Sequence, residues 1–127
     1  MRYVFIFRHG ERADLAPESR EEYQGHHDAP LTERGHQQAT EAGLFLKSEI
    51  ERIQQLEGRN FDQIYFKTSP FSRCMSTCSQ MAKANDLTTD AINVDYRYAE
   101  WLADWLYPAE SPLPHLDLRN NEMSALK

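Results

Sequence analysis

Hydrophobic residues follow one another without polar alternation at the start of the chain, over residues 3–7. A continuous β-prone run of this kind is typical of a central strand in a parallel sheet that is covered on both faces. We therefore expect residues 2–7 to form such a strand. Arg8, His9 and Gly10 follow it directly, at the carboxyl edge where open α/β sheets place their ligands.

A long amphipathic helix is predicted from Glu33 to about Leu56. Its small and aliphatic residues recur at spacings of three and four, at Ala39, Ala42, Leu46, Ile50 and Ile53. Thr32 is expected to be the N-cap of this helix, and Gly58 is expected to end it. Gly35 and Gly43 lie inside the helix, where each costs about 1 kcal/mol relative to alanine. We therefore expect each of these glycines to mark a close packing contact.

A second strand, a second helix and a third strand are predicted in the middle of the chain. Residues 61–67 and 91–94 have the composition of strands. The helix between them is expected to run to Ala84, with Ser69 as its cap and Pro70 in its first turn. Its expected buried residues are Phe71, Cys74 or Met75, Cys78, Met81 and Ala82.

The alternation of strands and helices predicts an α/β fold, with an open, mainly parallel sheet and helices on both faces. Two helices give little cover to a parallel sheet, so we expect residues 1–127 to be the N-terminal portion of a single, incomplete domain. A second copy or an assembly partner would then cover the exposed face. The polar residues 11–31 are expected to form an active-site loop. Residues 107–127 show no clear periodicity and are expected to begin a lid region.

Composition and charge exclude several classes of function. The 127 residues suit one domain, and the net charge of −6 argues against general binding to nucleic acid or a membrane surface. No apolar run approaches the ~20 residues that span a bilayer, and no targeting pattern is evident, so a cytoplasmic location is expected. Cys74 and Cys78 lack redox or zinc spacing and are expected to be reduced core thiols. His26-His27-Asp28 gives no tetrahedral ligand set, so no metal site is expected.

The arginines are placed where a phosphate pocket would need them. Phosphoryl transfer requires cations that hold the phosphoryl oxygens, a nucleophile, and a proton donor for the leaving oxygen. The segment Arg8-His9-Gly10-Glu11-Arg12 sets a histidine between two arginines at a strand end, where Gly10 would let the backbone approach a substrate closely. Arg73 lies in the first turn of the second predicted helix, at an end that favours anions. If the first two strands are neighbours, Arg73 and His9 face one cleft.

Four segments of the chain resemble motifs of the histidine phosphatase superfamily, which includes the cofactor-dependent phosphoglycerate mutases. The first is Arg8-His9-Gly10-Glu11-Arg12, and the second runs from Asp28 to Gly35, with Gln38-Ala39 beyond it. The third is Thr68-Ser69-Pro70-Phe71-Ser72-Arg73-Cys74, and the fourth is Ala99-Glu100-Trp101-Leu102. Their order matches the order in the family, and they are most similar to the branch with Arg-His-Gly-Glu-Arg and Glu-Trp motifs.

The resemblance implies a role for each site residue. His9 would attack phosphorus and become a phosphohistidine. Arg8 and Arg73 would hold the phosphoryl oxygens, with help from Arg12. Glu100 would protonate the leaving oxygen and then activate water. The resemblance implies no metal and no organic cofactor. It implies that the substrate of the protein is a phosphorylated small molecule or a phosphoprotein.

Two of these residues have a second interpretation. Arg12 could instead form an ion pair with Glu11 or Asp14 within the loop. Glu100 could be a solvated neighbour of the two tryptophans that follow it.

The sequence departs from the family pattern in one respect. The second catalytic histidine of the family lies in a His-Gly motif after a further strand, and His115 has neither the glycine nor the strand. Two functions therefore stay open. The first is a phosphatase, in preference to a mutase, that hydrolyses phosphomonoesters through a phosphohistidine. The second is a catalytically incomplete module that binds phosphorylated ligands or acts as a structural subunit of an assembly.

Overall fold

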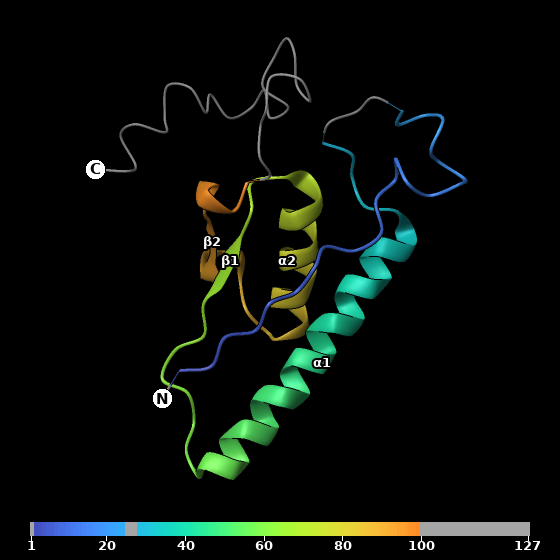
Figure 1. Ribbon diagram of the computed structural model, residues 1–127. Helices are drawn as coiled ribbons and strands as arrows, with labels where there is room; N and C mark the ends of the chain where they lie inside the picture. Colours follow the sequence, from blue (N-terminus) through green and yellow to red (C-terminus); the bar gives the residue numbers. More distant parts are fainter. Residues whose placement is uncertain (1, 25–27, 100–127) are drawn as a thin grey trace.

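The computed structural model describes residues 2–24 and 28–99 (Figure 1). Glu100 and the predicted lid region, 107–127, lie outside the described residues. The elements in chain order are α1 (Glu33–Glu57), β1 (Phe66–Thr68), α2 (Ser72–Ala84), η1 (Thr89–Ala91), β2 (Ile92–Val94) and η2 (Tyr96–Tyr98). Strands β1 and β2 pair in parallel, with Phe66 opposite Ile92. The predicted α/β class with a parallel sheet is confirmed.

Helix α1 agrees closely with its prediction. Thr32 caps it, because the Thr32 hydroxyl accepts a 2.9 Å hydrogen bond from the backbone N–H of Gly35. Gly58 ends the helix in the left-handed region, at φ 66°, where glycine carries no steric penalty. The buried positions are Gly35, Ala39, Gly43, Leu46, Ile50 and Ile53. No helix in the described part of the chain combines the length and apolar character needed to cross a bilayer.

Helix α2 ends at Ala84 as predicted but begins later than expected, at Ser72. Ser69 as its cap was a wrong prediction. The backbone stays extended at Phe71, with φ −65° and ψ 139°, so the helix starts beyond the reach of a cap at Ser69. The capping oxygens come instead from Asp28, which accepts from the Ser72 backbone N–H at 2.8 Å.

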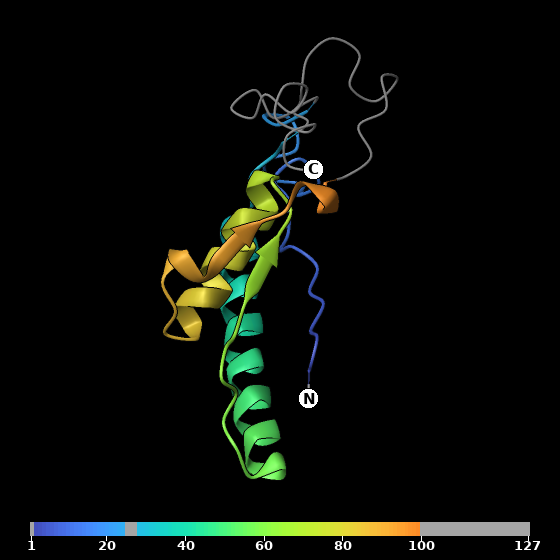
Figure 2. The ribbon, with the colours of Figure 1, turned by 90° about the vertical axis from the view of Figure 1, so that its left-hand side faces the viewer.

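The strands are short, and the core lies between them and the helices. The second predicted strand, 61–67, is confirmed only near its end, as β1, while β2 falls within the predicted 91–94. The central buried cluster contains Leu46, Ile50, Phe66, Cys78, Met81 and Ala82. Because Phe66 of β1 packs into one cluster with residues of both helices, α1 and α2 lie on the same face of the sheet (Figure 2).

The predicted strand at residues 2–7 was wrong, since these residues form no strand. They run beside β1, on the side away from β2, in both views (Figures 1 and 2). A central parallel strand needs cover on both faces, and this segment lacks cover on one of them. Val4 is 82% exposed and Ile6 is 92% exposed. Tyr3 anchors the segment, because its hydroxyl donates a 2.6 Å hydrogen bond to Glu57.

Candidate active site

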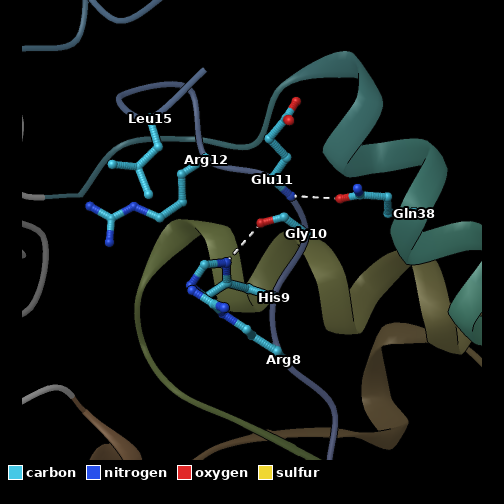
Figure 3. A pocket seen from close by; sticks show the side chains of 7 residues that line it. All are labelled: Arg8, His9, Gly10, Glu11, Arg12, Leu15 and Gln38. Carbon is cyan, nitrogen blue, oxygen red and sulfur yellow. Dashed lines mark hydrogen bonds between the residues drawn. The ribbon is translucent and has the colours of Figure 1, made fainter. Parts of the chain in front are cut away.

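A cavity of about 290 Å³ opens where the N-terminal segment reaches the start of α1 (Figure 3). Its lining residues are Arg8, His9, Gly10, Glu11, Arg12, Leu15 and Gln38. Three of the predicted site residues, Arg8, His9 and Arg12, are thus brought together. Leu15 and Gln38 had been given no role from the sequence. Helical spacing was the available signal for Gln38, because it follows the buried Gly35 by three residues on one face of α1.

The hydrogen bond that His9 makes defines which of its ring nitrogens is basic. Nδ1 of His9 lies 2.7 Å from the carbonyl oxygen of Gly10 (Figure 3). A carbonyl oxygen can only accept, so in the neutral ring Nδ1 carries the proton and Nε2 keeps its lone pair. The local backbone therefore leaves the outer nitrogen, Nε2, as the nucleophilic atom.

The surroundings of His9 lower its pKa below the ordinary value of 6.5. Burial is the largest cause, and the positive charges of Arg73, Arg12 and Arg8 act in the same direction. The hydrogen bond to Gly10 opposes them by favouring the protonated ring. The lowered pKa keeps the imidazole neutral at pH 7, which is the state that a nucleophile requires.

An NMR titration of the His9 ring should give a pKa below 6.5 in the folded chain. The urea-unfolded chain should show the ordinary value, because burial and the arginine charges are then lost. As the pH falls below 6.5, the unfolded ring binds its proton first. The free energy of unfolding should therefore decrease as the pH falls from 6.5 through the folded-state pKa. A folded-state pKa at or above the unfolded value would contradict this electrostatic description.

Arg12 lines the cavity with its guanidinium already engaged. Its Nε and Nη2 donate to the two carboxylate oxygens of Asp14, at 2.9 and 2.6 Å. This two-pronged pair is one of the alternatives that the sequence left open for Arg12. Asp14 thereby fixes the direction of the guanidinium and neutralises part of its charge.

Glu11 connects the histidine segment to the start of α1. Its backbone N–H donates a 2.9 Å hydrogen bond to Oε1 of Gln38. Its carboxylate accepts a 2.8 Å hydrogen bond from the Thr32 hydroxyl, and Figure 3 shows it directed away from the His9 ring. The role of Glu11 is therefore to fix the loop on the helix, and its carboxylate does not contact the histidine.

The backbone of Gly10 lies in close contact with the backbone of α1 at Gly35. A Cβ atom at Gly10 would lie 2.3 Å from the carbonyl oxygen of Gly35, and one at Gly35 would lie 2.4 Å from the carbonyl oxygen of Glu11. The two glycines thus allow backbone-to-backbone contact, which confirms the prediction of close packing for Gly35. The approach of the Gly10 backbone to a substrate stays a prediction, and Gly10 is one of the residues that line the cavity.

Arg73 lies in the first turn of α2, as predicted, but is not among the residues that line the cavity. It is only 4% exposed, with its guanidinium carbon 4.3 Å from the centre of the Phe71 ring. Its Nη1 lies 3.9 Å from Oδ1 of Asp28. The positive charge of Arg73 is nevertheless one of the causes that lower the pKa of His9. Arg73 is therefore buried outside the cavity lining and acts on His9 through its charge.

Thr77 links the turn that carries Arg73 to the segment that carries His9. Its hydroxyl accepts a 3.1 Å hydrogen bond from the backbone N–H of Gly10. The same hydroxyl donates a 2.8 Å hydrogen bond to the carbonyl of Arg73, one turn earlier in α2. Both bonds are buried, so they hold the two segments in a fixed relation.

The parallel α/β fold and the neutral histidine among three arginines fit a class of proteins that handle phosphate. Residues 4–105 match the family model of the histidine phosphatase superfamily, branch 1, and the chain belongs to this superfamily. Membership supports phosphatase- or mutase-type chemistry in general. No curated protein and no solved structure matches the chain.

Proposed function

We propose that the chain carries out phosphatase-type phosphoryl transfer, in which His9 becomes a phosphohistidine. The observation that supports this most is the hydrogen bond from Nδ1 of His9 to the Gly10 carbonyl. It leaves the lone pair of Nε2 available in a ring whose lowered pKa keeps it neutral. Arg8 and Arg12 line the same cavity and would meet the phosphoryl oxygens.

The reaction balances in two steps. In the first, Nε2 of His9 forms a bond to phosphorus while the bond from phosphorus to the ester oxygen breaks. The leaving alkoxide takes a proton from Glu100, a role that belongs to the proposal through the sequence motif alone. In the second step, water attacks phosphorus, gives its proton to Glu100, and releases inorganic phosphate and neutral His9.

The rate of the first step can be measured without the general acid. An aryl phosphate with an acidic phenol as leaving group needs no proton donor, so the reaction then depends on His9 and the arginines. When the protein is mixed with this aryl phosphate under single-turnover conditions, we expect one phenol to be released per chain. An acid-labile phosphoryl group should then remain on His9. Mass spectrometry at neutral pH would locate the group.

Two other outcomes of the same experiment are informative. A phosphoryl group found on another residue would contradict the assignment of His9. Binding of inorganic phosphate with no covalent product would favour the module that only binds phosphorylated ligands.

A further inference from the structure

The first turn of α2 is fixed by a residue from a distant part of the chain. Asp28 accepts hydrogen bonds from the Ser72 backbone N–H at 2.8 Å and from the Ser72 hydroxyl at 2.6 Å, across 44 positions of sequence. Phe71, which occupies the N-cap position, makes no side-chain capping bond. The Asp28 carboxylate therefore supplies the cap that local sequence does not.

The same carboxylate faces the guanidinium of Arg73. Oδ1 of Asp28, which caps the helix, lies 3.9 Å from Nη1 of Arg73. The side chains of the pair are 5% exposed for Arg73 and 12% for Asp28, so water screens their attraction only weakly. A buried guanidinium beside a fixed carboxylate has few orientations open to it.

Arg73 is thus held at three points. Its carbonyl is bound by the Thr77 hydroxyl, which also binds the Gly10 N–H next to His9. Its guanidinium lies over Phe71 and near Asp28. The Thr77 contacts set the position of the Arg73 backbone relative to His9, but they do not define the direction of its side chain. Asp28 is a charged group close enough to fix that direction.

We propose that Asp28 is a positioning residue, which holds Arg73 in the orientation from which its charge acts on His9 and on the phosphoryl group that His9 receives. The part that concerns the phosphoryl group rests on the proposed function. A carboxylate that served only as a helix cap would stabilise α2 without setting the direction of Arg73. The two roles differ in what loss of the charge does to His9.

Asp28→Asn separates the cap from the charge. The asparagine oxygen can still accept from the Ser72 N–H, and asparagine is among the best N-cap residues. The variant should therefore keep the cap of α2, and its thermal midpoint should fall only because the buried Arg73 loses its counter-charge. Asp28→Ala loses both functions and should lower the midpoint further. Ser72→Ala is the matched control, because it removes one hydrogen bond to Asp28 and leaves the carboxylate and the backbone cap in place.

The pKa of His9 is the first measurement, and it requires no ligand. The charges that act on His9 are those of Arg73, Arg12 and Arg8. If Asp28 positions Arg73, the asparagine variant releases the guanidinium, and the His9 pKa should rise towards 6.5. If Arg73 stays in place without Asp28, removal of a negative charge can only lower that pKa or leave it unchanged. A pKa that is unchanged or lowered in Asp28→Asn would overturn the proposal.

Binding of inorganic phosphate is the second measurement. Asp28→Asn should weaken it about tenfold, because the positive charge of Arg73 would no longer be held in the direction from which it attracts the bound anion. With Arg73 still in place, removing the acidic group should instead tighten it. Arg73→Ala should weaken binding at least as much, and Ser72→Ala should change neither measurement. If the unchanged chain bound no phosphate, the proposed function would fail, while the His9 titration would still decide the role of Asp28.

Discussion

Replacement of His9 by alanine is expected to abolish formation of the phosphoryl adduct and to lower hydrolysis of an aryl phosphate by at least ~10³-fold. Alanine has no lone pair to attack phosphorus, and no other described side chain in the cavity is a nucleophile of comparable strength. The arginines would still bind phosphate, so the loss should appear in the rate of the chemical step. Single-turnover release of the phenol, with a parallel phosphate-binding assay, would separate the two effects.

His36→Ala is the matched control for this experiment. His36 lies in the first turns of α1, is partly buried, and does not line the cavity. The His36→Ala variant should therefore release the phenol at the same single-turnover rate as the unchanged chain. If His9→Ala kept the full single-turnover rate, or if both variants lost it equally, a phosphohistidine at His9 would not be the intermediate.

The parts of the fold that local sequence encodes were predictable. Thr32 and Gly58 are capping residues whose effect depends on a few neighbouring peptide groups, and α1 begins and ends beside them. The buried face of α1 could be predicted from the spacing of its apolar residues by three and four positions, without knowing which element packs against it. Gly43 could be predicted to mark a close contact, although the identity of that contact could not.

The parts that depend on distant residues were not predictable. Residues 2–7 have the composition of a central strand, but such a strand depends on pairing and cover from distant parts of the chain, and Val4 and Ile6 are left exposed. The cap of α2 was sought at Ser69 because local rules place caps next to the helix, whereas the capping oxygens belong to Asp28. In the sequence, Asp28 belongs to a triplet that gives no tetrahedral ligand set and to a segment that resembles a family motif, and neither indicates a helix cap.

In the candidate site too, contacts between neighbours in the sequence were predictable and contacts between distant residues were not. That Arg8, His9 and Arg12 would lie together follows from their adjacency at one turn of the chain. The position of Arg73 depends on how α2 packs, and Arg73 is buried beside Phe71 and Asp28, outside the cavity lining. Its positive charge lowers the pKa of His9, and its predicted contact with the phosphoryl oxygens stays a prediction.

Gly10→Ala is expected to have the largest effect on stability, and to impair the site at the same time. The added methyl carbon would lie 2.3 Å from the carbonyl oxygen of Gly35 and 2.9 Å from its Cα. These are backbone atoms of α1, which cannot move aside as the end of a flexible side chain can. The segment must separate from the helix, and we expect a loss of about 3 kcal/mol in the free energy of unfolding. Urea denaturation would measure it.

The matched control is Gly43→Ala, which also creates contacts shorter than 3 Å, but with residues that do not line the cavity. Its methyl carbon would lie 2.7 Å from Cβ of Ala84 and 2.8 Å from Cα of Met81. Both variants should therefore be destabilised. Only Gly10→Ala should also disturb the hydrogen bond to Thr77 and displace His9, so the folded fraction of that variant alone should lose the lowered His9 pKa and the single-turnover rate. Equal retention of both properties in the two variants would show that the contact between Gly10 and Gly35 supports the fold without setting the position of the histidine.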